Sequence, residues 1–262
     1  MDFEPHAPVE VFGLPFNLTT VLMSWLVMLV LCVLGYLCTR RMGMVPGRFQ
    51  MALEMLVDFF DDVCRETFGI KRGRRFLPYV GTLFLFIWLS NILGIFPGLE
   101  EPTKDLNTPW ACGLMAFFTA HICGIRVRGL RAWAREFVEP ALTIKGHWFP
   151  NIFMFPLNLV GEIGKVVSHS FRLFGNIFGG VVIFSIVSSL LIKVPVFNVL
   201  IPLGLMGFFG LFVGTIQALV FAMLALTYAA VQVGEEEEEE SEQEEEKGAQ
   251  REERGKEATA GA

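Results

Sequence analysis

The sequence has few cysteines and none of the short motifs that mark common catalytic sites. Its five cysteines form no Cys-x-x-Cys pair and are Cys32, Cys38, Cys64, Cys112 and Cys123. This spacing indicates neither a disulfide framework nor a metal cluster. We interpret the cysteines as small apolar residues that fill space in the packing. No Gly-x-Ser-x-Gly or His-Glu-x-x-His motif occurs, and the neighbours Ser168 and His169 cannot face each other on one helix. A hydrolase is therefore not supported, and we expect no cofactor and no bound metal.

Charged residues are missing from several long stretches. Apolar residues make up 53% of the 262 residues, and the mean hydropathy is +0.52. A helix of about 20 apolar residues crosses a hydrocarbon core of about 30 Å. The sequence therefore predicts an all-α polytopic membrane protein with about five membrane-embedded helices, at residues 20–38, 76–96, 108–125, 151–192 and 195–233.

The first apolar segment does not have the flanks of a signal peptide. It follows the acidic residues Asp2, Glu4 and Glu10 and precedes Arg40 and Arg41, and it has no small-residue cleavage site. We expect it to stay in the mature chain.

Basic residues gather in two loops, which predicts the orientation. One loop, 39–75, carries seven lysines and arginines near its two ends, and the residues after Ile125 include Arg126, Arg128, Arg131 and Arg135. The linker between the second and third spans instead has Glu100, Glu101 and Asp105 against Lys104. The positive-inside rule then predicts both basic loops in the cytoplasm, the N-terminus outside and the C-terminus in the cytoplasm.

An amphipathic helix is predicted inside the first basic loop. Apolar residues at helical spacing oppose acidic ones: Leu53, Leu56, Phe60 and Val63 against Glu54, Asp58, Asp61 and Asp62. Such a helix either lies on the membrane surface or packs against a neighbouring helix.

The last two apolar segments are too long for ordinary spans. A helix of about 38 residues is roughly 57 Å long at 1.5 Å per residue, nearly twice the thickness of the core. Each is therefore predicted to be strongly tilted, beyond the usual average of about 20°. Pro195 and Pro202 predict a turn and an early kink at the start of the second one.

The residues after the last span are acidic and lack large apolar side chains. From Glu235 onward the sequence has thirteen glutamates and four basic residues, which gives this segment a net charge of −9. The residues before it therefore carry a net charge of +3. Such a segment cannot bury a core. We therefore predict a membrane-embedded helical domain at 1–234 and an acidic, disordered cytoplasmic tail at 235–262.

Polar and small residues in the fourth segment follow a helical repeat. They are Asn158, Glu162, Lys165, His169, Arg172, Asn176 and Gly179, at steps of 4, 3, 4, 3, 4 and 3, so they lie on one face of one helix. Glu162 and Lys165 can simply pair with each other. Arg172 has no suitable carboxylate within a turn or two, although an intramembrane arginine costs roughly 2.5 to 3.5 kcal/mol. We expect its partner on another chain.

The fifth segment carries a second stripe, Gly204, Gly207, Gly210, Gly214 and Gln217. Glycines at this spacing are typical of close helix–helix approach in lipid. Gln217 extends the same face and is predicted to reach Arg172 on the facing helix. His121, in the third span, is more typical of a hydrogen-bonded bundle residue than of a proton carrier.

Two stretches make the sequence similar to subunit a of the F-type ATP synthase membrane sector. The run from Ser170 to Gly180, SFRLFGNIFGG, with Lys165 before it, resembles the signature of that family. The run TIQALVF from Thr215, followed by Tyr228, is similar to its last helix, and residues 45–50 and 102–108 match less specifically.

The resemblance implies a stator beside a rotating ring of c subunits, with two offset half-channels for H⁺ or Na⁺. It assigns the essential arginine to Arg172, the supporting amide to Asn176 and the polar partner on the last helix to Gln217. We expect Lys165, His169, Ser168, Glu162 and Asn158 to be supporting polar residues of this site. Its implied partners are the c-ring, the subunit b peripheral stalk, the remaining ATP synthase subunits and lipid, with no nucleic acid. The chain would be a non-catalytic subunit of a bacterial plasma-membrane complex.

Two features depart from this family. Many relatives carry a glutamate or histidine where this sequence has Val181, and a histidine or glycine where it has Gly210. The outer half-channel therefore lacks one familiar titratable group, and water or other side chains must line it. Val166 replaces a common proline, which predicts a straighter helix. The alternative is a stand-alone channel or secondary transporter that binds an anion at Arg172, but that class predicts internal repeats, and the sequence has none.

Overall fold

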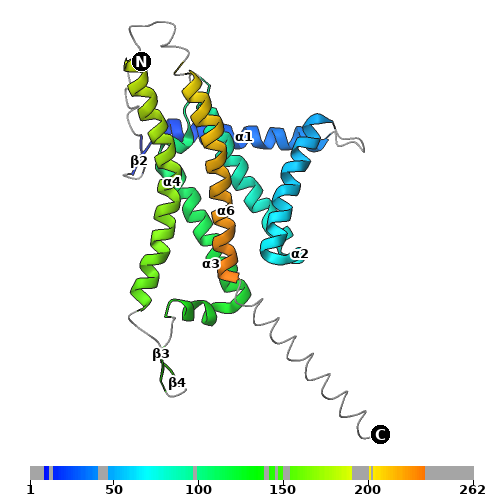
Figure 1. Ribbon diagram of the computed structural model, residues 1–262, viewed down its shortest axis with the longest axis vertical. Coiled ribbons are helices and arrows are strands. Elements are labelled where there is room, and N and C mark those ends of the chain that lie inside the picture. The colour runs from blue at the N-terminus through cyan, green and yellow to red at the C-terminus, as the bar shows by residue number, and fades with distance from the viewer. Residues whose placement is uncertain are drawn as a thin grey trace. The chain divides into compact units, whose positions relative to one another are not determined.

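The computed structural model describes residues 9–11, 14–40, 47–96, 99–138, 142–144, 147–149, 154–190, 201 and 203–233 (Figure 1). Five helices in this part of the chain are long and apolar enough to cross a membrane. They are α1 (Leu18–Arg40), the Arg72–Leu93 part of α2, most of α3 (Asn107–Glu136), α4 (Met154–Leu190) and the stretch Leu203–Val233. The predicted helical class, with five helices of this kind, is confirmed. The acidic tail, Pro195 and Pro202 lie outside the described residues.

Two short antiparallel hairpins accompany the helices and were not expected. Strand β1 (Val9–Val11) pairs with β2 (Leu14–Phe16), and β3 (Leu142–Ile144) pairs with β4 (His147–Phe149). Each strand has three residues, which is too short for the alternation that reveals a strand in a sequence.

The chain divides into two compact units, which we describe separately. The first consists of residues 1–115 and 162–226, and the second of residues 116–161 and 227–262. The first unit therefore holds α1, α2, the 3₁₀ helix η1 (Pro102–Lys104), most of α4, and the π-helix η2 (Phe208–Val213), which continues into α6 (Gly214–Val233).

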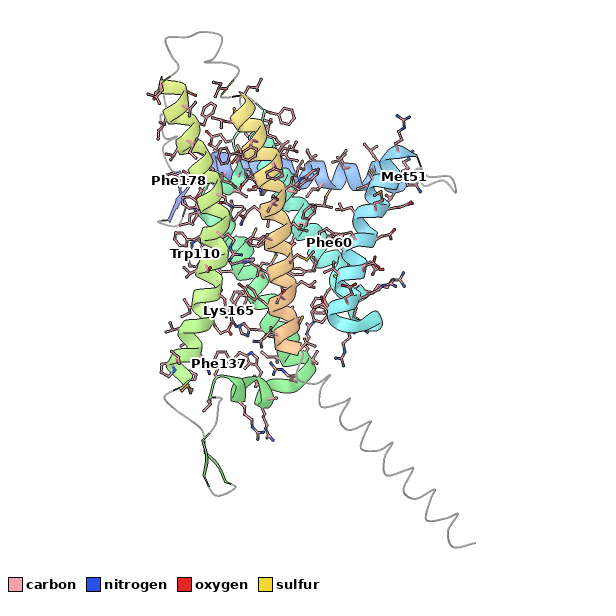
Figure 2. The ribbon with its side chains drawn as sticks, in the orientation of Figure 1. Met51, Phe60, Trp110, Phe137, Lys165 and Phe178 are labelled. Atoms are coloured by element: carbon pink, nitrogen blue, oxygen red, sulfur yellow. The ribbon has the colours of Figure 1, made fainter. Side chains whose placement is uncertain are left out.

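Helix α2 (Arg48–Leu93) is a hairpin of two helical arms. It turns at Gly69, whose φ of 74° is accessible mainly to glycine. Phe68 stacks on Phe76 with ring centroids 4.1 Å apart, and Phe60 contacts Phe84 at 5.0 Å, so the two arms run antiparallel. Met51 and Phe60 mark the first arm in Figure 2. The amphipathic helix therefore packs against a neighbouring helix, and its position on the membrane surface stays a prediction.

Helix α1 is tied to the linker before α3 by two hydrogen bonds at its beginning. Asn17 donates to Asp105 Oδ2 at 2.8 Å, and Thr20 donates to the same oxygen at 3.1 Å. Val27 is its only buried residue, and large apolar side chains such as Leu22, Trp25 and Leu29 are more than half exposed. This surface suits a helix whose surroundings are lipid.

Helix α4 is one continuous helix of 37 residues, which corresponds to about 55 Å. No break interrupts α4 around Val166, and the straighter course expected there stays a prediction. No membrane accompanies the chain, so the tilt of α4 and α6 stays a prediction.

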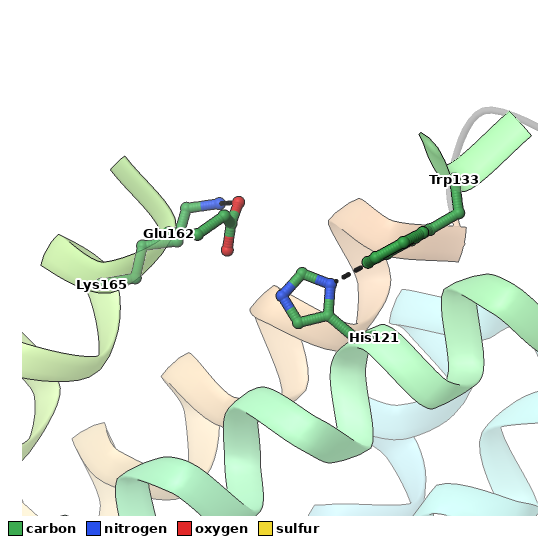
Figure 3. A network of polar contacts seen from close by, with 4 residues as sticks. All are labelled: His121, Trp133, Glu162 and Lys165. Carbon is green, nitrogen blue, oxygen red and sulfur yellow. Dashed lines mark hydrogen bonds and ion pairs between the residues drawn. The ribbon is translucent and has the colours of Figure 1, made fainter. Parts of the chain in front are cut away.

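The second unit contains a turned-back end of α3. The helix changes direction at Gly129, with a φ of 82°. Trp133 Nε1 then donates to His121 Nδ1 at 3.0 Å (Figure 3), and the Phe137 ring lies 6.2 Å from the His121 ring. His121 is thus a buried, hydrogen-bonded residue, as its surroundings in the sequence indicated.

Candidate functional site

Arg172 lies on an exposed face of α4 within the first unit. Its neighbours His169 and Leu173 are buried, whereas Arg172 itself is exposed. Among the described residues, the guanidinium has no hydrogen bond and no ion pair. A permanently charged group on a long apolar helix therefore faces the surroundings of this chain. It is available to a group that another chain supplies.

Asn176 and Gln217 join α4 to α6 one helical turn beyond Arg172. Asn176 Nδ2 donates to Gln217 Oε1 at 2.5 Å. Gln217 is 5% exposed, and its buried Nε2 has no hydrogen-bond partner in the described part of the chain. The hydrogen bond that the structure shows for Gln217 is with Asn176, and the expected contact of Gln217 with Arg172 stays a prediction.

The other polar residues of α4 have separate surroundings. Lys165 pairs with Glu162 at 2.5 Å, the pairing that the sequence allowed (Figure 3). His169 is buried with its ring centroid 3.7 Å from that of Phe221 on α6, and Ser168 is exposed. In the second unit, Asn158 donates to the Phe137 carbonyl at 3.1 Å. The structure therefore brings Asn176 and Gln217 together, but it does not gather all the predicted residues around Arg172.

A cavity of about 180 Å³ lies in the first unit next to the Asn176–Gln217 pair. Its lining includes the end of α2, residues 99–104, one side of α4, η2 and the start of α6. Asn176 and Gln217 contribute amides, and Glu101 contributes a carboxyl. Val181 and Gly210 also line it, so neither α4 nor η2 adds a titratable side chain there.

Buried hydrogen bonds hold the walls of this cavity together. Asn91, which is 1% exposed, donates to the Gly214 carbonyl at 3.0 Å and accepts from Thr103 at 2.9 Å. Trp88 Nε1 donates to Thr215 Oγ1 at 2.9 Å. These bonds tie the end of α2 to η1 and to the start of α6. Sequence reasoning missed Asn91, although a lone amide in an apolar segment is a signal for such a role.

Two glycines of the predicted stripe allow this close approach. A Cβ on Gly210 would overlap Ile95, and one on Gly214 would overlap Asn91, whereas Gly204 and Gly207 have open space. The close packing therefore occurs at the second half of the stripe, beside η2. The π-helix itself was not predicted, and such turns are often found at functional sites.

Glu101 was counted in the sequence only as a loop charge, and the structure gives it a different position. Its side chain occupies the space beside the Cα of Gly94, which any Cβ at that position would fill. Burial raises the pKa of Glu101 to about 7, and the nearby Lys104 opposes part of this rise. The described residues contain no group of three or more His, Cys, Asp or Glu side chains that could hold a metal ion.

Five apolar helices with an exposed arginine, one helical turn from a part-buried hydrogen bond between two side-chain amides, define a helical membrane protein with a polar site on its long helices. A family model described as ATP synthase A chain matches residues 21–230. The chain is 40% identical over 225 residues to ATP synthase subunit a of Moorella thermoacetica, covering 85% of this chain and 95% of that protein. It is also 38% identical over 213 residues to ATP synthase subunit a 1 of Crocosphaera subtropica, covering 80% and 85%. The chain belongs to the ATP synthase A chain family.

Proposed function

We propose that this chain is the ion-translocating stator subunit a of an F-type ATP synthase and that Arg172 faces the carboxylate of a rotating c-ring. Family membership supports the general part of this proposal, namely that the chain is a subunit of the membrane sector of this complex. It is not the catalytic part. Its further proposed partners are the subunit b peripheral stalk, the remaining ATP synthase subunits and lipid.

The observation that carries the proposal is the exposed guanidinium on α4, which has no partner in the part of the chain that the structure describes. Arginine remains charged at any physiological pH, so it cannot deliver the proton itself. A carboxylate that approaches it is held in the ionised form, because an opposite charge at close range lowers a carboxyl pKa. Away from Arg172, surrounding lipid favours the neutral or ion-loaded carboxyl. This difference couples the protonation or ion loading of each carboxyl to its position on the ring, and the fixed charge of Arg172 blocks ion leakage past it.

Two half-channels complete the proposed mechanism. Asn176 and Gln217 are the supporting amides, and the remaining polar residues of α4, from Asn158 to His169, are proposed to serve the path on the side of the basic loops. The positive-inside rule places those loops in the cytoplasm, the N-terminus outside and the C-terminus in the cytoplasm. Bacterial relatives support a bacterial plasma membrane as the location. The transported ion is H⁺ or Na⁺.

Replacing Arg172 tests this proposal. We expect Arg172→Ala to abolish ion-driven ATP synthesis in inverted membrane vesicles. Arg172→Lys keeps the charge but loses the planar fork of donors, so we expect severe impairment there too. Arg131→Ala removes an exposed arginine of the basic region and serves as the matched control, with a rate near that of the wild type.

The assembled complex must be present for these rates to be interpreted. Copurification of the variant chains with the c, b and soluble ATPase subunits provides this control. A wild-type synthesis rate in Arg172→Ala would contradict the proposal. Purification of the wild-type chain alone, without the other subunits, would instead favour a stand-alone transporter.

A further inference from the structure

We infer that Glu101 is the proton-exchanging side chain of the ion path at the end of the bundle opposite the basic loops. This inference rests on the proposed function, because it assigns a residue to a path that the stator must provide. It concerns a residue outside the long helices α4 and α6, in the linker between the second and third spans. Four observations support it: the lining of the cavity, the anchoring of η1, the burial of the carboxyl and the free amide of Gln217.

The cavity contains few groups that can take up a proton. Its charged lining residues are Glu100, Glu101 and Lys104, and they all come from the same linker. The lining residues from α2, α4, η2 and α6 are uncharged. Lys104 carries its proton at neutral pH, and Glu100 is exposed. Glu101 is therefore the partly buried carboxyl in this lining.

The position of Glu101 is held by buried contacts. It directly precedes η1, and Thr103 within η1 donates to Asn91, which in turn donates to the Gly214 carbonyl. Thr103 and Asn91 are both almost completely buried. Gly94 leaves the space that the Glu101 side chain occupies. The carboxyl thus lines the cavity on a framework that also positions the start of α6.

The surroundings suit exchange of a proton near neutral pH. Burial favours the neutral acid, and the pKa of about 7 lets both forms be populated. Lys104 and Glu100 are the charged neighbours from its own linker, and Asn91, Asn176 and Gln217 are uncharged. A water molecule occupies about 30 Å³ in the liquid, so the cavity has room for several. The free Nε2 of Gln217 is a donor for such water.

The proposed step is a simple proton relay. On the aqueous side, the Glu101 carboxylate accepts a proton from hydronium, which leaves water. The resulting carboxylic acid then releases the proton to water in the cavity beside the Asn176–Gln217 pair. Only O–H bonds form and break, so no oxidant, reductant or cofactor is needed.

Glu101→Gln in the assembled ATP synthase tests the relay, because it keeps the size of the side chain and removes the titration. We expect ATP synthesis in proteoliposomes to fall at least about tenfold, and Glu101→Asp to retain most of the rate. Glu66→Gln, an exposed glutamate on the first arm of α2, is the matched control. Synthesis is measured while the pH of the compartment facing Glu101 varies from 5 to 9 at constant total driving force.

The pH profile separates a relay from a structural role. In the wild type, Glu101 is mostly protonated below about pH 7 and mostly ionised above it, so we expect an inflection of the rate near this pH. Glu101→Gln should lose the inflection, and Glu66→Gln should keep it. A wild-type rate and an unchanged profile in Glu101→Gln would overturn the inference.

Two further variants keep the test decisive. Gly94→Ala retains the Glu101 carboxyl but fills the space that the Glu101 side chain occupies, so we expect a lower rate of ATP synthesis in this variant as well. If Glu101→Gln does not assemble, a wild-type rate and pH profile in Gly94→Ala overturns the inference. Arg172→Ala is measured in parallel. Loss of synthesis in Arg172→Ala with a normal Glu101→Gln rejects only the relay, whereas a normal Arg172→Ala rejects the proposed function.

Discussion

Gln217 is a buried amide with one satisfied end and one open end. The residue is only 5% exposed. Its Oε1 accepts a hydrogen bond from Asn176, whereas its Nε2 has no hydrogen-bond partner among the described residues. An unsatisfied buried donor destabilises a protein by about 1–3 kcal/mol. Such an arrangement is expected where the missing partner comes from water in the adjacent cavity or from another chain.

Replacing Gln217 by leucine separates stability from activity. We expect Gln217→Leu to leave assembly intact, because a similar volume is kept and an unsatisfied donor is removed. ATP-driven ion pumping should fall about 2-fold to 10-fold, which corresponds to a hydrogen bond with a net value of about 0.5–1.5 kcal/mol. Fluorescence quenching in inverted vesicles measures pumping, and the subunit content of the purified complex measures assembly. Full pumping by Gln217→Leu would exclude a role for the amide.

The hairpin of α2 shows how an element depends on one close backbone contact. A Cβ on Gly73 would overlap the backbone of Cys64 and Arg65 on the other arm. Cys64 itself is fully buried between the arms. Burial raises the pKa of its thiol to about 11, and the Asp61 carboxylate adds to this rise. The thiol is thus a reporter of whether the arms are closed.

Gly73→Ala should open the hairpin of α2. The overlap involves backbone atoms that cannot rotate away, and overpacking of this kind costs about 1–3 kcal/mol. We expect alkylation of Cys64 to become at least about tenfold faster at pH 8, because an exposed thiol has a lower pKa and more thiolate. The measurement uses maleimide labelling in a chain whose other four cysteines are replaced by serine.

Gly81→Ala is the control for this experiment, since Gly81 lies in the same helix and has open space around its Cα. Alanine favours a helix over glycine by about 1 kcal/mol, so this variant should keep Cys64 protected. Equal labelling of the two variants would show that the contact at Gly73 does not hold the arms together.

At the scale of the whole molecule, apolar side chains are widely exposed on the helices. Trp25, Phe118, Val160 and Leu190 are all more than half exposed. In water such a surface would promote aggregation, whereas in a bilayer it is an ordinary lipid-facing surface. Residues 235–262 contrast with it, because they carry a net charge of −9 and no large apolar residue.

Removing residues 235–262 should therefore leave assembly and ion translocation nearly intact. A segment without apolar side chains to bury cannot hold a helix bundle together. An electrostatic role would instead appear as reduced pumping at low salt, and it would fade as the Debye length falls from about 10 Å at 0.1 M to about 3 Å at 1 M. ATP-driven pumping of the truncated chain at both salt concentrations distinguishes the two. Loss of the complex from the membrane would show that the tail is structural.

The sequence by itself determined the class of the protein and the candidate residues on its long helices. Helical periodicity and the absence of charge are local properties, so they revealed five spans and the polar stripe that contains Arg172 and Asn176. The resemblance in the same segments identified the family. The amphipathic repeat likewise predicted the first arm of α2, although it left open what that arm packs against.

Only the tertiary structure decided which distant segments meet. Asn91 and Gly214 are separated by 123 positions, and Asn176 and Gln217 by 41, and no local pattern specifies such pairs. The hairpin turn at Gly69, the π-helix and the position of Glu101 beside Gly94 belong to the same group. They depend on side-chain volumes and hydrogen bonds satisfied between elements, which exist only after the helices have packed. For this reason a glutamate that looks like a loop charge in the sequence lies, in the fold, on the wall of a cavity.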